Sequence, residues 1–202
     1  MIELLAITDD ATPPEPPLVA VSSGKLSALC APAGDPDEQL TADALWRREA
    51  VIEELMATRD LLPVRYGTRV ADEAAAVDAL AERRDELEAG LARVRGAVEL
   101  AVRIHGDGPE PEPSAEASGR EYLRARIGRT HAATRLHEPL AALARDSVVQ
   151  PGAELLRAAY LVERDAVGAF VARVQELQRE HPALAVLCTG PWPPYSFAAP
   201  KP

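Results

Sequence analysis

The chain has 202 residues, which is enough for one or two domains with a sizeable core. It carries 32 acidic and 22 basic side chains, a formal net charge of -10, so charge repulsion excludes nucleic acid and anionic lipid as general partners. No apolar run approaches the ~20 residues of a membrane-spanning helix, and no basic stretch precedes the apolar residues near Met1. We therefore expect a cytoplasmic protein that binds neither nucleic acid nor a lipid membrane.

The first 60 residues predict three strands and a helix. Residues 2–7 are apolar apart from Glu3, and the apolar segments 18–21 and 26–30 flank a Ser-Ser-Gly-Lys turn that is typical of a hairpin. A helix is expected from Thr41, whose hydroxyl can cap it, to Asp60. The apolar residues of this helix recur at helical spacing on one face: Leu45, Ile52, Leu55 and Met56.

Residues 61–68, Leu-Leu-Pro-Val-Arg-Tyr-Gly-Thr, predict a fourth strand. Pro63 confines it to a sheet edge or a strand start, because proline has no amide donor. Gly67 permits a bend, and in an extended segment Arg65 and Tyr66 point to opposite faces. Two roles for Arg65 stay open: it anchors a carboxylate or the carbonyls of a nearby loop, or it binds a ligand.

Residues 71–95 predict the longest helix of the chain. Apolar residues alternate by threes and fours along it, with Arg84 at the one polar position of the seam. These residues are Val77, Leu80, Leu87, Leu91, Val94 and Val98. Twenty-five residues at ~1.5 Å each would span roughly 37 Å, long enough to join two domains. The seam packs within one chain or forms a dimeric coiled coil, and we expect a monomer.

The remainder of the chain predicts a domain of alternating strands and helices around a Pro-, Glu- and Ser-rich loop at 106–119. The expected elements are a strand at 99–104, a helix at 120–137, strands at 147–150 and 155–162, a helix at 165–180 and a strand at 184–188. This order is that of the ferredoxin-like split βαβ fold, βαββαβ. We thus predict an α+β protein of two domains, residues 1–70 and 96–202, joined by the long helix 71–95.

The C-terminal segment concentrates prolines and aromatic rings. The chain has only two Trp, four Tyr and two Phe, and three of these rings, Trp192, Tyr195 and Phe197, follow Pro191 within six positions. Because proline fixes φ, such a segment stays extended at low entropic cost and can lay its rings on a surface. Either the tail seals an edge of its own domain or part of its surface meets a partner, since aromatic residues are favoured interface anchors.

Residue patterns typical of catalysis are not found in the sequence. The glycines form no phosphate-binding loop, and Ser22 and Ser23 lie outside a nucleophile-elbow motif. His131 and His137 are six residues apart and fall on different faces of a helix, and no cysteine spacing fits zinc. We expect a protein that is not an enzyme and that holds no cofactor and no metal.

Two motifs, residues 62–68 (LPVRYGT) and 189–197 (TGPWPPYSF), resemble the gas vesicle protein F/L family, GvpF/GvpL. The C-terminal motif is similar to the C-terminal signature of that family, and the mid-chain motif is similar to its LPxRFGT segment. The order of elements and the helix start at 119–123 (GREYL) also resemble the family, so the resemblance covers essentially the whole chain. It departs at the start of the first helix, where members often carry His and this chain has Trp46-Arg47.

The resemblance implies an accessory or minor structural protein of gas vesicles, found in the cytoplasm and at the vesicle. It implies binding to the small hydrophobic shell protein A, contact with other accessory proteins, and a role in nucleating or assembling the shell. We predict that an apolar segment of shell protein A is held at a sheet surface or edge bordered by the two motifs. The candidate partner-binding residues are Arg65, Tyr66, Gly67, Thr68, Trp192, Tyr195 and Phe197.

Two alternatives are kept beside this interpretation. A ferredoxin-like domain can form a small-molecule or enzymatic site between its sheet and a covering loop, and Arg65, Tyr66 and Tyr160 could line one. The other alternative is a scaffold protein that dimerises through the long helix. Solution mass across a dilution series separates this scaffold from a monomer.

Overall fold

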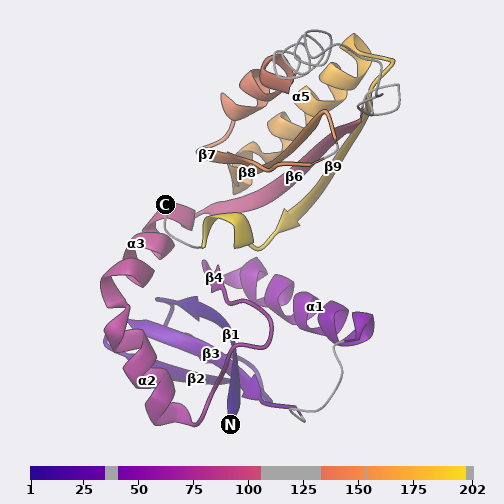
Figure 1. The fold of residues 1–202 in the computed structure, drawn as a ribbon. Helices are drawn as coiled ribbons and strands as arrows, with labels where there is room; N and C mark the ends of the chain where they lie inside the picture. The colour runs from indigo at the N-terminus through magenta and orange to yellow at the C-terminus, as the bar shows by residue number, and fades with distance from the viewer. Residues whose placement is uncertain (35–40, 106–132, 153, 199–202) are drawn as a thin grey trace, which may run out of the picture. The chain divides into compact units, whose positions relative to one another are not determined.

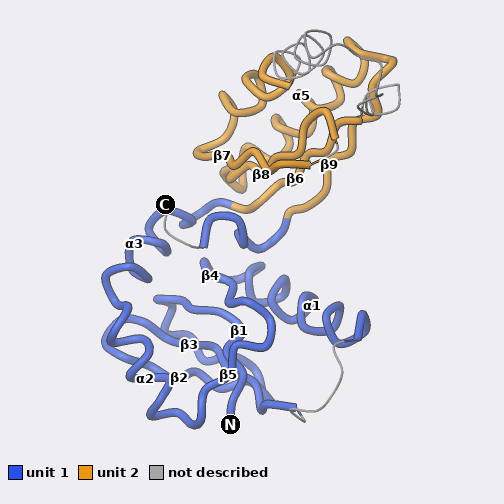
Figure 2. The backbone as a smooth tube through the Cα atoms, viewed as in Figure 1, with its two compact units in different colours: residues 1–97, 192–202 blue, residues 98–191 orange. Residues whose placement is uncertain are grey.

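The computed structural model of the chain describes residues 1–34, 41–105, 133–152 and 154–198 (Figure 1). They form a mixed α+β architecture with two sheets, which confirms the α+β part of the predicted fold class. The chain divides into two compact units, unit 1 with residues 1–97 and 192–202 and unit 2 with residues 98–191 (Figure 2). These bounds differ from the predicted division, because the helices after residue 70 and the C-terminal tail both belong to unit 1.

Unit 1 is built on a five-stranded sheet in the order β2-β3-β1-β4, with β5 also paired to β1. The strands are β1 (Ile2–Thr8), β2 (Val19–Ser23), β3 (Leu26–Pro32), β4 (Leu62–Pro63) and β5 (Arg69–Val70). The predicted hairpin is present, since β2 and β3 pair antiparallel up to Ser23 and Leu26. Gly24 turns the chain there with a φ of 65°, a value that glycine adopts without strain.

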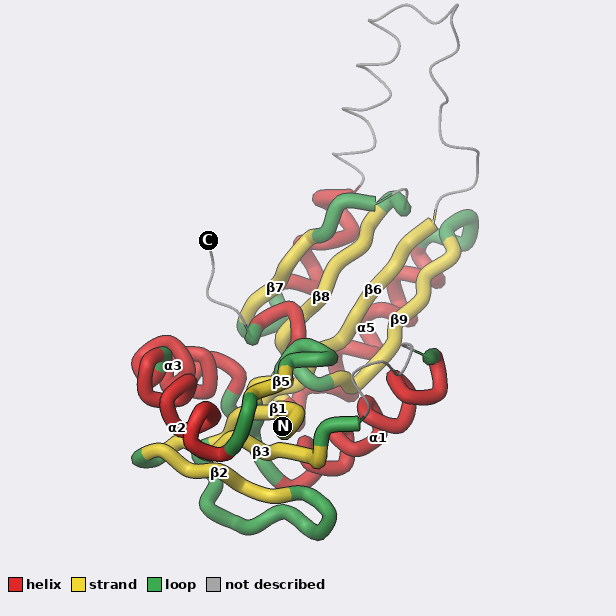
Figure 3. Tube along the Cα trace, turned by 60° about the horizontal axis from the view of Figure 1, so that its bottom comes forward, coloured by secondary structure: helices red, strands yellow, loops and turns green. Residues whose placement is uncertain are grey.

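Helices cover both faces of this sheet (Figure 3). α1 (Ala42–Thr58) lies on one face, with its buried residues Ile52, Leu55 and Met56 turned inward. α2 (Glu73–Glu82) and α3 (Arg84–Val94) lie on the other face. The predicted cap of α1 forms, because Thr41 Oγ1 accepts the amide three residues on, and Asp72 Oδ1 caps α2 in the same way. The inward faces of these helices and the sheet residues that they cover form the core of unit 1.

The single helix predicted over residues 71–95 is wrong, because α2 and α3 are separated at Arg83. Arg83 has φ -111° and ψ 18°, outside helical values, and its guanidinium pairs with Glu86 at 2.9 and 2.6 Å. A straight helix of roughly 37 Å would overhang strands of seven residues, which span about 23 Å. The break lets both halves cover the sheet, and Leu80, Leu91 and Val94 are buried there.

Unit 2 contains a four-stranded sheet in the order β7-β8-β6-β9. Its strands are β6 (Ala97–His105), β7 (Asp146–Val149), β8 (Leu156–Glu163) and β9 (Ala185–Trp192), the first and last of which run into unit 1. A helix over residues 133–141 and α5 (Val167–Glu180) pack with the strands in one core, which includes Leu140, Tyr160 and Phe170. The predicted loop 106–119 and most of the predicted helix 120–137 lie outside the described residues. No helix within the described ranges is both long and apolar enough to span a bilayer.

Candidate functional site

The mid-chain motif forms the irregular outer edge of the sheet in unit 1. β4 and β5 each pair with β1, and between them the amide of Val64 donates to Leu5 O and the amide of Leu4 to Thr68 O, both at 2.9 Å. The extended segment predicted over residues 61–68 is therefore only partly correct. After Val64 the chain makes a turn over Arg65–Thr68.

The turn is closed by Thr68, whose amide and hydroxyl both donate to Arg65 O, at 3.2 and 2.8 Å. Gly67 occupies its third position with a φ of 75°, the left-handed conformation that this kind of turn requires. Arg65, Tyr66 and Gly67 are exposed as a result. The Arg65 carbonyl, and not its guanidinium, makes the anchoring contacts of this turn.

Arg48 of α1 holds the edge segment in place. Its guanidinium pairs with Glu3 Oε1 at 3.1 Å and donates to Leu4 O at 3.3 Å and to Val64 O at 2.6 Å. The Arg48 side chain is 8% exposed and that of Glu3 is 13% exposed, so this ion pair lies largely out of water. The Gly67 amide also donates to Glu3 Oε1, at 3.4 Å. One buried ion pair thus joins α1, β1 and the turn.

Tyr195 of the C-terminal tail reaches the same arginine. Its hydroxyl donates to Glu49 Oε2 at 3.0 Å and accepts from Arg48 Nη1 at 3.3 Å, while the Arg48 guanidinium lies 5.6 Å from the Tyr66 ring centroid. Burial, together with the nearby Glu49 carboxylate, raises the pKa of Tyr195 to about 12. Burial also raises the pKa of Glu49. The tail motif and the mid-chain motif therefore meet at one guanidinium.

Phe197 fixes the tail to α3. It is fully buried in the short 3-10 turn η2 (Tyr195–Phe197), its carbonyl accepts from Arg93 Nη1 at 3.3 Å, and the Arg93 guanidinium lies 5.4 Å from its ring. α3 approaches the edge closely here, because a Cβ on Gly90 would stand 3.0 Å from Leu62 Cδ1. Trp192, at the end of β9, is half-buried. The tail therefore packs on unit 1, whereas the sequence assigned it to the C-terminal domain of residues 96–202.

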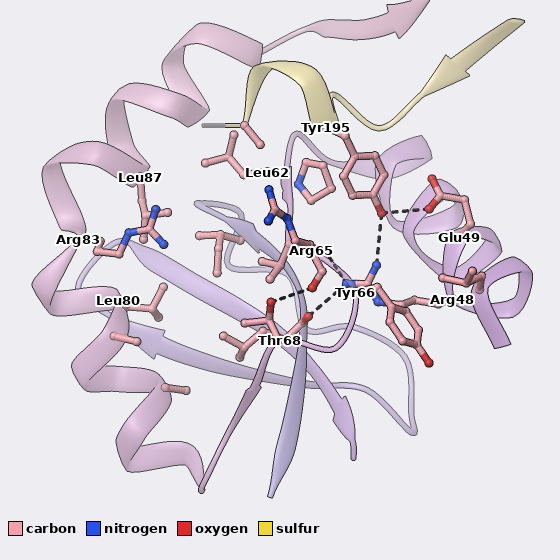
Figure 4. A pocket seen from close by; sticks show the side chains of 18 residues that line it. Arg48, Glu49, Leu62, Arg65, Tyr66, Thr68, Leu80, Arg83, Leu87 and Tyr195 are labelled. Atoms are coloured by element: carbon pink, nitrogen blue, oxygen red, sulfur yellow. Dashed lines mark hydrogen bonds between the residues drawn. The ribbon is translucent and has the colours of Figure 1, made fainter. Parts of the chain in front are cut away.

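The two motifs border one cavity of about 640 Å³ within unit 1, here named the edge cavity (Figure 4). Arg65, Tyr66, Thr68 and Tyr195 line it. The other three predicted residues, Gly67, Trp192 and Phe197, do not line it. In Figure 4, Arg48, Glu49 and Tyr195 lie on the α1 side, and Leu80, Arg83 and Leu87 lie on the α2–α3 side. Much of the lining is apolar, including Leu4, Ile7, Leu62, Val64, Leu80 and Leu87.

Arg48 and Glu49 were not predicted from the sequence. A signal for Arg48 exists: it is three residues after Leu45 and four before Ile52, so it lies on the face of α1 that turns toward the sheet. An arginine at such a position needs a carboxylate or carbonyls to receive it. Glu3 in the first strand is the matching acid, but the pairing of residues 45 positions apart is a tertiary fact.

The third residue considered for a small-molecule site, Tyr160, is fully buried in the core of unit 2. Its ring contacts Phe170 at a centroid distance of 5.1 Å, and its hydroxyl is 2.9 Å from His137 Nδ1. Burial raises the pKa of Tyr160 and lowers the pKa of His137. Tyr160 therefore lines no cavity with Arg65. Among the described residues, no cluster of three or more His, Cys, Asp or Glu could hold a metal ion.

Comparison with known proteins identifies the class of protein that has this fold and edge. The sequence profile described as "Gas vesicle synthesis protein GvpL/GvpF" matches residues 7–199. The chain belongs to the GvpL/GvpF family of gas vesicle proteins, as the two motifs predicted.

Individual relatives agree with this assignment. Gas vesicle protein L of a Streptomyces species is 33% identical, with 91% of this chain and 84% of the relative covered. Gas vesicle protein F2 of Halobacterium salinarum is 28% identical, with 96% and 86% covered. The crystal structure of GvpF from an Anabaena species superposes with a TM-score of 0.78 at 18% identity, covering 99% of this chain and 98% of that one. At that identity the superposition shows the shared fold.

Proposed function

We propose that this protein is a non-enzymatic accessory or minor structural protein of gas vesicles, present in the cytoplasm and at the vesicle. In this proposal it binds the hydrophobic shell protein A, assists nucleation and assembly of the shell, and contacts other gas vesicle proteins. Family membership and the names of the relatives support the gas vesicle role. The observation that carries the binding proposal is that both motifs border one largely apolar cavity at a sheet edge.

The edge cavity suits an apolar segment better than an added β-strand. β4 offers only two paired residues and one of them is Pro63, so the backbone at this edge has few donors for strand addition. Apolar side chains of a partner, in contrast, meet leucines from both helical layers. Each Leu, Val or Ile side chain that enters contributes about 1.5–3 kcal/mol, so a few of them offset the cost of association.

Charge supports the same proposal. The chain carries a net charge of -10, which keeps the protein dispersed while it holds a poorly soluble partner. Most charged side chains of the cavity have partners: Arg48 pairs with Glu3, Arg83 pairs with Glu86, and Glu49 accepts from the Tyr195 hydroxyl. The apolar side chains and the exposed Arg65 are then the main groups for a partner to contact.

Two structural proposals accompany this function. The order β9-β6-β8-β7, with both helices packed in one core, supports a ferredoxin-like fold for unit 2. The burial of Leu80, Leu91 and Val94 within unit 1 supports a monomer, because these seam residues are not available for a dimeric coiled coil. A constant mass across a dilution series is the expected result, and a dimer at micromolar concentration would contradict it.

The binding proposal is tested by pull-down with purified shell protein A. The variant Tyr66→Ala/Tyr195→Ala removes two rings that line the edge cavity and are each 36% exposed. The matched control Leu143→Ala/Leu187→Ala removes two exposed side chains of unit 2. We expect capture to fall at least tenfold in the first variant and to stay at the wild-type level in the second. If both folded variants capture shell protein A equally well, the two motifs serve only in packing within the protein and do not bind this partner.

A further inference from the structure

Unit 1 has a second hollow, of about 700 Å³, which we name the α1 groove. It runs along α1 and is bordered by the proline-rich loop of residues 12–18. Its apolar lining includes Leu5, Leu18, Ala44, Val51 and Leu55. The groove shares Arg48 and Tyr66 with the edge cavity, so these side chains separate the two hollows.

The α1 face of the sheet has room for another helix. α2 and α3 cover the opposite face, whereas α1 alone lies on this one within the described residues. On β2, Val21 faces α2 and is 6% exposed, but its neighbours Ala20 and Ser22, which point to the α1 face, are exposed. Four strands about 4.8 Å apart are wider than one helix of ~10 Å. Among the residues that the structure describes, part of this sheet face is therefore left without a helical layer.

α1 itself presents a continuous stripe to the groove. Apart from the adjacent pair Glu54 and Leu55, its lining residues are spaced by three and four along almost the whole helix: Ala44, Arg47, Val51, Glu54, Leu55 and Thr58. This spacing places them on one face of α1, beside the face that packs on the sheet. A 17-residue helix is about 25 Å long, so the stripe can accompany several turns of a second helix.

The lining of the groove carries four arginines, Arg47, Arg48, Arg59 and Arg69, against three glutamates, Glu3, Glu15 and Glu54, in a protein whose net charge is -10. The guanidinium groups of Arg47 and Arg69 line it and make no hydrogen bond or ion pair with the described part of the chain. Arg59 donates from Nη1 to Thr12 O at 2.9 Å, but its buried Nε finds no partner among the described residues. A buried donor without an acceptor is costly unless a ligand supplies one. These groups make carboxylates the complementary chemistry.

We propose that the α1 groove docks an amphipathic helix of another protein, with its apolar stripe along Val51 and Leu55 and its carboxylates at Arg47 and Arg69. This surface shares only Arg48 and Tyr66 with the edge cavity, so the protein would hold two partners at once. The helix completes the layer that α1 begins, which buries the apolar floor of the groove. The guanidinium groups of Arg47 and Arg69 disfavour a basic helix and orient an acidic one.

The test uses a fluorescent peptide of about 15 residues, with leucines spaced by three and four and flanking glutamates, and a matched peptide with lysines in place of the glutamates. Binding to the full chain is measured by fluorescence anisotropy. Arg47→Gln/Arg69→Gln removes the two charges, and Arg179→Gln on α5 is its control. Ala44→Trp fills the groove, and Ala50→Trp, at an exposed position of α1 outside both hollows, is the matched control.

We expect the glutamate peptide to bind, with a Kd raised about 3- to 10-fold by Arg47→Gln/Arg69→Gln and more than about tenfold by Ala44→Trp. Both controls should bind as the wild type does, and the lysine peptide should bind at least about tenfold more weakly. Circular dichroism checks that each variant is folded. No binding of either peptide at about 1 mM, or equal binding of both, overturns the proposal. If the protein is a dimer and Ala44→Trp dissociates it, the proposal is also overturned, because the groove is then occupied by a second copy of the chain.

Discussion

Replacing Arg48 with Met removes the guanidinium that joins α1 to the sheet edge of unit 1. Because the side chains of Arg48 and Glu3 are 8% and 13% exposed, the change leaves a largely buried carboxylate without its cation. Breaking a buried ion pair in this way costs about 3–5 kcal/mol. The carbonyls of Leu4 and Val64 lose a donor as well. We expect the free energy of unfolding of unit 1 to fall by about 3–5 kcal/mol.

Urea denaturation followed by tryptophan fluorescence measures this loss, because both tryptophans, Trp46 and Trp192, belong to unit 1. Arg83→Met is the matched control, since the Arg83 side chain is 59% exposed in its pair with Glu86 and its loss should leave the midpoint unchanged. The double variant Glu3→Gln/Arg48→Met should lose less than Arg48→Met, because no unpaired charge remains. A loss below about 1 kcal/mol for Arg48→Met, the range of a surface pair, would refute the reasoning.

Three further predictions concern the turn, the tail and the core of unit 2. Gly67→Ala should lower stability by about 1 kcal/mol, because φ is 75° there, although no atom lies within 4 Å of the new Cβ. The control Gly168→Ala, at an unhindered helical position, should be neutral or stabilising by up to about 1 kcal/mol. Equal effects of the two changes in thermal unfolding would contradict this prediction. Tyr195→Phe should cost about 0.5–1.5 kcal/mol and expose the tail to limited proteolysis, whereas an unchanged cleavage rate would mean that its hydroxyl does not hold the tail. Burial lowers the pKa of His137 in the folded state, so the unfolded state binds more protons below about pH 6.5. The contribution of His137 to the stability of unit 2 should therefore be complete above that pH and be lost as the pH falls below it. His137→Gln should reduce this dependence of stability on pH, measured by unfolding monitored by circular dichroism. An identical slope in that variant would assign the effect to other groups.

Local patterns predicted most of the elements because they depend on neighbours in the chain. The β2–β3 hairpin follows from two apolar segments around Gly24, and the start of α1 follows from Thr41. The interruption at Arg83 was missed because the apolar seam continues through it, and only the length of the sheet limits how far a straight helix can run. The edge segment was predicted as extended because its apolar residues outweighed the turn signal of Gly67.

The candidate residues were predicted from motifs, but their arrangement was not. Four of the seven line the edge cavity, and Phe197 is instead buried against Arg93 of α3. No local pattern in the sequence indicates that Tyr195 contacts Arg48, which lies 147 positions away in the chain. Such a contact depends on the path of the tail back to unit 1, which the prolines permit and do not direct.

The amino-acid sequence by itself determined the family, the α+β class, the cap of α1, the hairpin and the two motifs, because each depends on residue types at short spacing. Only the tertiary structure decided that the tail returns to unit 1, that a buried Arg48–Glu3 pair joins α1 to the sheet edge, and that two separate hollows flank that pair. The physical reason is that contacts between residues far apart in the chain form only where buried charges find partners and apolar faces are covered in the same fold. That condition involves residues from every element of the unit at once.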